Sequence, residues 1–233
     1  MQVQYEGKDL EAMSFAQNYH RWIVHLFRPY LGTTVAEVGA GSGNFSSMLL
    51  SEKPQELVVV EPSQEMYPLL KEKFAADTRV VPIHAIFADV CDQYPDHFDS
   101  IVYVNVLEHI EHDAQELSYI HTSLRQGGYV CIFVPALPWL YSELDASLGH
   151  YRRYTKAQLR QILSDAGFEI VRISYFDIFG IIPWFILFTL LRRKITPGNT
   201  ALYDTLVVPV ARVIESIVPV PIGKNVLAIA RKK

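Results

Sequence analysis

The sequence contains little cysteine and no excess of basic residues, and each shortage excludes a class of protein. Its 233 residues include two cysteines, Cys91 and Cys131, which lie far apart and match no metal-ligand spacing. We therefore expect the reduced, buried cysteines of a cytoplasmic protein. The 21 lysines and arginines and 25 acidic residues give a net charge of −4, so no overall field favours nucleic acid as a partner.

Long apolar runs are also missing. No uninterrupted run reaches the ~18 residues that a transmembrane helix needs. Residues 1–15 show no basic region followed by an apolar one, so we expect no signal peptide. Half of the residues are hydrophobic and about a fifth are charged, which is typical of a globular protein with one sizeable core. The chain is therefore expected to form a single domain over residues 1–233.

The pattern that is present is a regular alternation of strand-like and helical segments. Apolar, β-branched runs predict strands at residues 34–38, 56–61, 80–89, 98–105, 129–136, 168–177 and 224–232. Helical periodicity predicts helices at residues 10–32, 43–50, 62–76, 112–126 and 155–167. This alternation indicates an α/β fold, a doubly wound sheet with helices on both faces. Residues 1–32 would form a helical cap ahead of the first strand.

Local signals refine these helices. Thr155 with Gln158 three residues later predicts a capping box at the start of the last helix. Pro68 should kink or shorten the helix that Ser63 begins, because proline lacks the backbone N–H of the helical ladder. Gly127–Gly128 are expected to end the helix before the fifth strand.

Glycines and polar residues gather where the first four predicted strands end. The first strand is followed by Gly39, Gly41 and Gly43, and the next three strands end at Glu61, Asp89 and Asn105. In an open α/β sheet, ligands bind at the carboxyl ends of the strands. The glycines permit positive φ in a tight turn and let a ligand approach the backbone. The sequence therefore predicts a ligand site at this edge.

The glycine spacing argues against a dinucleotide. G-x-G-x-x-G would need a glycine at Asn44 or, counted from Gly41, at Ser46. Glu37, two residues before the first glycine, would repel a pyrophosphate and suits a ligand with a positive charge. A nicotinamide-dependent oxidoreductase is therefore the less favoured alternative.

The segments VAEVGAGSGNFS, VVVEPS, FADV, FDSIVYVNVLEHI and LRQGGYVCIFVPA, in this order and spacing, resemble class I S-adenosylmethionine-dependent methyltransferases. The resemblance covers residues 19–176 and the last strand. It implies a seven-stranded Rossmann-like sheet with the last strand antiparallel, S-adenosylmethionine as cofactor and S-adenosylhomocysteine as product. The LEH segment is similar to that of small-molecule methyltransferases and departs from the [DN]-P-P-[YF] of enzymes that methylate exocyclic or amide nitrogens.

The resemblance also implies roles at the methionine end of the cofactor. Glu37 would hold the cationic amino group through water. Gly39 and Gly41 would let the backbone approach the ligand, with Asn44 in the same cofactor-binding set. Asn105 would contact the methionine moiety through its backbone carbonyl.

At the adenosine end, the resemblance implies that Glu61 accepts hydrogen bonds from both ribose hydroxyls, beside Pro62. Asp89 would bind the adenine amino group, with Val90 as a backbone partner. A helix N-cap is the alternative role for Asp89. Tyr19, on the predicted N-terminal helix, would cover the cofactor or pack in the core.

Methyl transfer from a sulfonium is a direct displacement, so the sequence need not show a conspicuous catalytic group. The catalytic candidates are His109, in the turn after the fourth strand, and His150, Tyr151, Arg152 and Arg153, after the fifth. His150 would be the base for a hydroxyl acceptor, the arginines would bind an anionic acceptor, and Tyr151 would line the pocket. The alternative is a loop tied down by an Arg–Asp145 pair. No cluster of acidic residues and histidines suggests a metal, so none is expected.

An apolar segment, residues 177–222, separates the last two strands, and we expect it to form a helical insertion before the last strand. Its first part, residues 178–194, contains Pro183 and ends in the basic residues Arg192–Lys194. Three interpretations stay open: a lid over a hydrophobic acceptor pocket, a peripheral contact with the inner face of the membrane, or a homodimer face or core. We expect methyl transfer to a hydroxyl or carboxylate oxygen of a small-molecule or lipid-linked acceptor. The alternative is a non-catalytic, membrane-associated cofactor-binding module.

Overall fold

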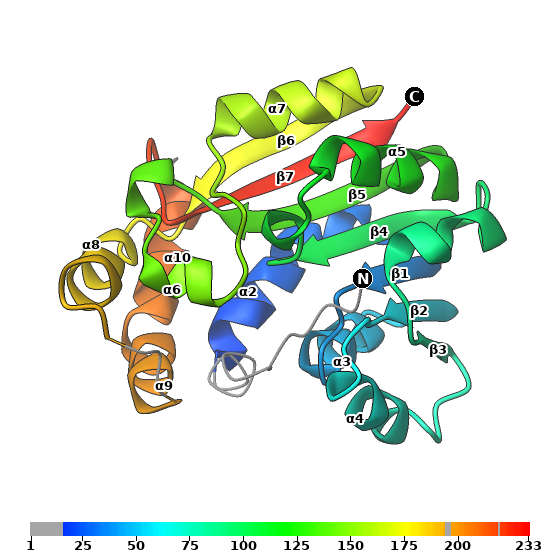
Figure 1. Cartoon of the computed structure of the whole chain (residues 1–233), viewed down its shortest axis with the longest axis horizontal. Helices are drawn as coiled ribbons and strands as arrows, with labels where there is room; N and C mark the ends of the chain where they lie inside the picture. The colour runs from blue at the N-terminus through cyan, green and yellow to red at the C-terminus, as the bar shows by residue number, and fades with distance from the viewer. Residues whose placement is uncertain (1–15, 194–196, 219) are drawn as a thin grey trace.

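The computed structural model describes residues 16–193, 197–218 and 220–233, through which one seven-stranded sheet runs (Figure 1). Its strands are β1 Thr34–Val38, β2 Glu56–Val60, β3 Val80–Ile83, β4 Phe98–Val104, β5 Leu124–Pro135, β6 Phe168–Phe176 and β7 Asn225–Lys232. They lie in the order β3-β2-β1-β4-β5-β7-β6. Strands β1 to β5 run parallel, and β7 runs antiparallel to β5 and β6. The predicted Rossmann-like sheet with an antiparallel last strand is confirmed.

Helices cover both faces of this sheet. They are α2 Gln17–Phe27, α3 Asn44–Ser51, α4 Met66–Lys73, α5 Asp113–Ser123, α6 Glu143–Ser147, α7 Lys156–Asp165, α8 Ile181–Trp184, α9 Pro197–Leu206 and α10 Val208–Ile217. One face packs against α5 and α7, and the other against α2, α3, α4 and α10 (Figure 1). Part of the predicted cap, residues 1–15, lies outside the described residues; its described part is α2 and the 3₁₀ turn Arg28–Tyr30.

The strand sequences explain why the sheet is buried on both faces. In β2, Leu57, Val58, Val59 and Val60 are all fully buried. Val58 and Val60 face the core beneath α5 and α7, whereas Leu57 and Val59 face the core beneath α2, α3 and α4. An unbroken apolar run is therefore the pattern of a strand with a helical layer on each side.

The third strand is shorter than predicted. It lies at the sheet edge beside β2, and the last pair in their register is Val60 with Ile83. Because β2 ends there, the chain beyond Ile83 turns away from the sheet. Asp89 lies exposed in the 3₁₀ helix Phe87–Asp89. The prediction that Asp89 ends a strand is wrong.

The helix before the fifth strand also ends earlier than predicted. It stops at Ser123, and Gly127 and Gly128 lie inside β5 instead of ending a helix. The pairing of Leu124 with Phe98 of β4 draws these residues into the sheet. A Cβ on Gly128 would lie 2.9 Å from a backbone carbonyl oxygen, so close packing of the backbone requires glycine here.

The capping-box prediction is confirmed, whereas the prediction that Ser63 is the N-cap of the helix containing Pro68 is wrong, because the N-cap of that helix is Glu65. The hydroxyl of Thr155 accepts a hydrogen bond from the backbone N–H of Gln158, whose side chain accepts one from the N–H of Thr155. Helix α4 begins at Met66, where the hydroxyl of Ser63 accepts a backbone hydrogen bond. Pro68 therefore falls in the first turn, where its missing N–H costs no helical bond.

The segment between β6 and β7 is helical, as predicted, and docks on the N-terminal helix. Its elements are α8, the π-helix Phe185–Leu190, α9 and α10. The carboxylate of Asp204 in α9 accepts hydrogen bonds from the backbone N–H groups of Asn18 and Tyr19, at 2.9 and 2.8 Å. These groups lie in the first turn of α2, which has no local side-chain cap. The insertion thus completes the start of α2.

The same insertion carries both core and surface apolar residues. Val208 and Ala211 of α10 are buried in the core that α2 shares. We call the following residues, all more than half exposed, the exposed apolar set: Leu190, Leu191, Leu202, Leu206, Val210, Val213 and Ile217. Across the described ranges, no helix combines the length and apolar character needed to cross a membrane.

Candidate active site

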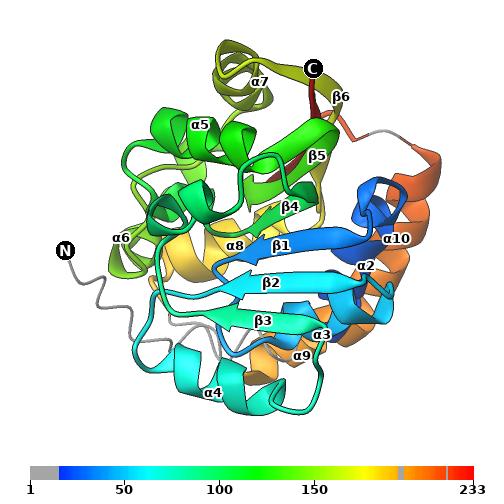
Figure 2. The ribbon, with the colours of Figure 1, turned by 90° about the vertical axis from the view of Figure 1, so that its right-hand side faces the viewer.

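A cavity of about 270 Å³ lies at the edge where β1, β2, β4 and β5 end and β7 begins. Figure 2 shows β1, β2 and β3 ending together at one edge, as their parallel pairing requires. Eleven of the residues expected at the site line the cavity: Tyr19, Glu37, Gly39, Gly41, Asn44, Glu61, Pro62, Asn105, His109, His150 and Arg153. The other four, Asp89, Val90, Tyr151 and Arg152, lie outside its lining.

The glycine turn after β1 adopts the left-handed backbone that glycine favours. Gly39, Gly41 and Gly43 have φ of +71°, +56° and +79°. A Cβ on Gly39 would lie 2.4 Å from Val106, and one on Gly43 would lie 2.6 Å from the ring of Phe74. Packing within the protein therefore requires glycine at both positions, while Gly41 lines the cavity.

Glu37, in β1, is buried at one end of the cavity. Its Oε2 has no hydrogen-bond partner within the described part of the chain. Burial raises the pKa of Glu37 to about 8, with a further contribution from the charge of Glu61, against the hydroxyl of Ser46 and the ammonium of Lys73. A buried carboxyl group of this kind favours a cationic ligand group that would supply the missing partner.

Glu61 is buried beside the glycine turn, and both of its carboxylate oxygens accept backbone hydrogen bonds. Oε2 accepts from the N–H of Gly41 at 2.7 Å, and Oε1 accepts from that of Ser63 at 2.8 Å. Burial raises the pKa of Glu61, and these two N–H groups oppose that shift. Each oxygen keeps a second lone pair, so the carboxylate is held in place and can still accept from a ligand.

The opposite end of the cavity is organised by Asp145 of α6, which is fully buried. One carboxylate oxygen lies 3.0 Å from Nδ1 of His150 and accepts from Nε of Arg153 at 2.8 Å. The other accepts from the backbone N–H of Ser142 at 2.9 Å. Burial alone would raise the pKa of Asp145, but the hydrogen bonds and charge of His150, Arg153 and Ser142 outweigh it and hold the pKa at about 2.

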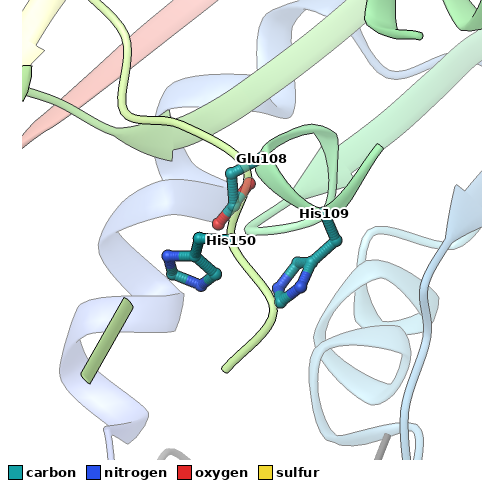
Figure 3. A group of neighbouring side chains, drawn as sticks. All are labelled: Glu108, His109 and His150. Carbon is teal, nitrogen blue, oxygen red and sulfur yellow. The ribbon is translucent and has the colours of Figure 1, made fainter. Parts of the chain in front are cut away.

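Glu108 and His109 lie in the 3₁₀ turn Leu107–His109 after β4, and they converge with His150 (Figure 3). Glu108 is fully buried, and among the described residues neither of its carboxylate oxygens has a hydrogen-bond partner. Burial raises the pKa of Glu108 to about 7, against the charges of His150 and Arg153. Burial, with the charge of His150, lowers the pKa of His109 to about 3.

Of the three residues that follow His150, two lie outside the cavity and the third is already paired within the protein. Tyr151 is about half exposed, outside the cavity. Arg152 pairs with Asp113, 2.9 Å away, and donates to a backbone carbonyl. Arg153 lines the cavity, but its guanidinium is bound to Asp145 and to the carbonyl of Ala136. The arginine–Asp145 pair considered from the sequence is thus present, and neither arginine is oriented for an anionic acceptor.

Residues that sequence reasoning missed enter the cavity from the last strand. Lys224 and Asn225 line it, and the hydroxyl of Tyr19 donates to the side-chain oxygen of Asn225 at 2.9 Å. The ammonium of Lys224 lies 3.1 Å from a carboxylate oxygen of Asp177 and over the ring of Trp184. These residues belong to no motif in the sequence. They reach the site because the last strand runs antiparallel, which brings its amino end to this edge of the sheet.

A second cavity of about 120 Å³ adjoins the first. Tyr19, Trp184 and Lys224 line both. The rest of its wall is mainly apolar and comes from the N-terminal helix and the insertion: Ala16, Gly180, Pro183, Leu187, Phe188, Thr200, Tyr203, Asp204 and Val208. The insertion therefore borders the site as well as the core.

A family model described as a methyltransferase domain matches residues 13–173. The chain belongs to this family and is therefore an enzyme of the methyltransferase class. This assignment disfavours both the oxidoreductase and the non-catalytic module considered from the sequence.

Solved structures show the same fold. The S-adenosylmethionine-dependent methyltransferase from Archaeoglobus fulgidus aligns with a TM-score of 0.65 and 14% identity, covering 96% of this chain and 99% of that one. A chain from the complex between the Haloferax volcanii Trm112 methyltransferase activator and the putative methyltransferase gives 0.66 and 14%, covering 97% and 94%. At such identities, the likeness concerns the fold.

Among curated proteins, ribosomal RNA small subunit methyltransferase A of Pelagibacter ubique (strain HTCC1062) is 43% identical over 47 residues. This match spans 20% of the chain and 18% of that protein's length. Together, the family and the fold support S-adenosylmethionine as the cofactor.

The residues present fit this cofactor. S-adenosylmethionine carries a cationic amino group and a vicinal ribose diol. Within the described chain, the buried Oε2 of Glu37 has no hydrogen-bond partner, so it suits the cationic amino group. The fixed carboxylate of Glu61, with its remaining lone pairs, suits the diol.

Glu37→Gln tests the raised pKa of the buried carboxyl group. Between about pH 4.5 and about pH 8 the folded protein keeps a proton on Glu37 that the unfolded chain loses, so stability falls as pH rises through this window. The variant lacks this titration. We therefore compare the unfolding free energy of the variant minus that of the wild type at two pH values. This difference should be more positive at about pH 8.5 than at about pH 5.5, by on the order of 2 kcal/mol. Urea unfolding of the ligand-free proteins measures this difference, and parallel pH profiles would contradict the assignment.

Proposed function

We propose that the protein transfers a methyl group from S-adenosylmethionine to a hydroxyl or carboxylate oxygen of a small-molecule or lipid-linked acceptor. The observation that supports this most is that one cavity holds both Glu37, whose Oε2 is unpartnered in the described chain, and His150, oriented by a carboxylate. The first suits the cationic end of the cofactor. The second suits an acceptor that must lose a proton.

Binding and alignment are the main tasks of the chain's residues. When bound, S-adenosylmethionine supplies an activated methyl group, so the rate depends on how well the acceptor is aligned. We propose that Glu37 holds the amino group, Glu61 the ribose hydroxyls, and the backbone carbonyl of Asn105 the methionine moiety. The N–H of Asn105 donates to the carbonyl of Phe133 at 2.8 Å, which fixes this residue at the end of β4.

Further residues complete the proposed cofactor site. The cavity wall beside the carboxylates is formed by Tyr19, Gly39, Gly41, Asn44 and Pro62. Asp89 and Val90 follow β3 and lie outside the lining, so their proposed role is at the outer, adenine end.

His150 is the residue that we propose to act on the acceptor. The Asp145 carboxylate holds Nδ1, which assigns the proton to that nitrogen and leaves Nε2 to accept one. S-adenosylmethionine would supply the methyl carbon to the acceptor oxygen and would keep the electron pair of the broken carbon–sulfur bond on sulfur. The proton of a hydroxyl acceptor passes to Nε2, whereas an ionised carboxylate acceptor needs no base. His109 stands beside this path.

The second cavity supports an acceptor with an apolar part. Its wall adjoins the proposed cofactor site at Tyr19, Trp184 and Lys224. An apolar chain lying there would place a polar head in the main cavity. The exposed apolar set lies on the same insertion, with the basic residues Arg192 and Arg193 beside it; Lys194 lies outside the described residues. We propose that this surface makes a peripheral contact with a membrane on its cytoplasmic side.

Glu61→Gln tests the ribose assignment. The substitution keeps the shape of the side chain and removes one acceptor and the charge. We expect binding of S-adenosylhomocysteine to weaken by about 1–3 kcal/mol, because a buried hydroxyl loses its partner. Calorimetric titration measures this affinity, with the exposed Glu72→Gln as the matched control. Equal affinities for wild type and Glu61→Gln would contradict the role of Glu61.

His150→Gln tests the acceptor end. We expect turnover to fall by about 10²–10⁴-fold with a hydroxyl acceptor, while the affinity for S-adenosylhomocysteine stays unchanged. Release of S-adenosylhomocysteine is measured with hydroxyl, carboxylate and amine acceptors, both soluble and in detergent micelles. Turnover confined to amines would overturn the oxygen assignment, and a loss of cofactor affinity would exclude a role limited to the acceptor.

Co-sedimentation with anionic liposomes tests the membrane contact. We expect binding at low salt that weakens at moderate salt, because basic residues accompany the apolar ones. Val213→Asp with Ile217→Asp should abolish it, whereas Leu69→Asp, an exposed apolar position on α4, should not. Wild-type protein that stays in the supernatant would make the exposed apolar set a homodimer face, which sedimentation velocity would then detect.

A further inference from the structure

Three side chains with metal-ligand chemistry meet at the acceptor end of the cavity. Glu108, His109 and His150 each offer one ligand atom, and these atoms all lie within 4.8 Å of one another. Two of them come from the turn after β4 and the third from the loop after α6, so only the folded chain brings them together (Figure 3). The spacing in the sequence, one adjacent pair and a residue 41 positions later, gives no metal signal.

Glu108 supplies a second, independent observation. Its side chain is fully buried, and both carboxylate oxygens lack a hydrogen-bond partner in the described part of the chain. Buried carboxylates are normally paired, hydrogen-bonded or bound to a metal. The nearby guanidinium of Arg153 is already bound to Asp145 and a backbone carbonyl. The carboxylate of Glu108 is thus aimed at a place where a cation would satisfy it.

Both histidines are oriented as metal ligands usually are. Nδ1 of His150 lies 3.0 Å from the carboxylate of Asp145, and the ring of His109 donates to the backbone carbonyl of Leu148. A ligating histidine usually donates its other ring N–H to such an acceptor, which fixes the tautomer and the ring. The Arg153–Asp145 pair in turn holds the carboxylate in place. Nδ1 of His150 is therefore committed to Asp145, which leaves Nε2 as the atom that His150 offers to the cluster.

We propose that Glu108, His109 and His150 bind one divalent transition-metal ion, of the Zn²⁺, Fe²⁺ or Mn²⁺ class. Two imidazoles and one carboxylate are nitrogen and oxygen donors that suit these ions and leave positions open for an oxygen ligand. Mg²⁺ and Ca²⁺ prefer sites built from oxygen alone. The expectation from the sequence that no metal binds is replaced by this proposal.

The proposal rests on the proposed function and changes how the acceptor oxygen is activated. All three ligands line the cavity that holds Glu37 and Asn105, so the ion and the methyl donor share one space. An acceptor hydroxyl bound to the ion loses its proton to water more easily, because the cation stabilises the oxyanion. The oxygen then attacks the methyl carbon and the sulfur keeps the electron pair of the broken bond. In this step His150 would be a ligand, which replaces the role of base given to it under the proposed function, and the proton would pass to water.

Titration of the chelator-treated, tag-free protein with Co²⁺, Mn²⁺ and Zn²⁺ tests the proposal. We expect one ion per chain, with visible d–d absorption for Co²⁺ that reports nitrogen and oxygen ligands. Glu108→Gln and His150→Gln should each weaken binding at least tenfold. The matched controls are the exposed Glu111→Gln and His25→Gln, which should bind as wild type does. Absence of binding by the wild type, or equal binding by Glu108→Gln, would overturn the site.

Titration with S-adenosylhomocysteine in the presence of chelator separates this proposal from the proposed function. Cofactor binding without any metal binding would leave the methyltransferase assignment intact and overturn the metal site. Metal binding without cofactor binding would uphold the site and overturn the proposed function. Turnover that resists chelation, with the pH profile of one imidazole, would show that His150 acts as a base and contradict the role of the ion.

Discussion

The buried carboxylate of Asp145 is the interaction on which the acceptor end of the site depends. It binds His150, Arg153 and the start of its own helix, and Arg153 in turn donates to the carbonyl of Ala136 next to the end of β5. The guanidinium neutralises a charge that would be costly without a partner in the core. The same carboxylate holds the imidazole of His150 in one orientation against the turn after β4. Without this pair, the backbone bond from the N–H of Tyr151 to the carbonyl of Glu108, at 2.8 Å, would still hold the loop, but the imidazole of His150 would lose the carboxylate that orients it.

Four of the buried carboxylates at this edge, Glu37, Glu61, Glu108 and Asp145, are satisfied in different ways, and the differences locate the ligands. Asp145 has the guanidinium of Arg153 and the imidazole of His150 as partners, and Glu61 has two backbone N–H groups. Glu37 and Glu108 keep oxygens that no group in the described chain satisfies. Because an unsatisfied buried carboxylate destabilises the fold, its place is best explained by a ligand that completes it. Glu37 faces the proposed cofactor amine, and Glu108 faces the proposed cation.

Sequence patterns predicted the features that are local and missed those that need a partner. The apolar run of β2 and the glycine turn were predictable because burial on two faces and positive φ leave direct marks. The end of β3 was not, since it is set by where β2 stops pairing. In the sequence, Glu108 was noted only as part of the LEH segment, and no role was predicted for it. The convergence of Glu108 with His150 depends on a contact between two loops, which no spacing in the sequence reveals.

The antiparallel last strand explains why the insertion borders the site. A connection between two parallel strands must cross from one edge of the sheet to the other. Strand β6 ends at the ligand edge, and β7, being antiparallel to it, begins there, with Asn225 opposite Phe176. The chain between them can therefore stay at that edge. Residues added there extend the cavity wall, as Trp184 and Lys224 do, without disturbing the sheet. This topology lets one segment cap α2, line both cavities and carry an apolar surface.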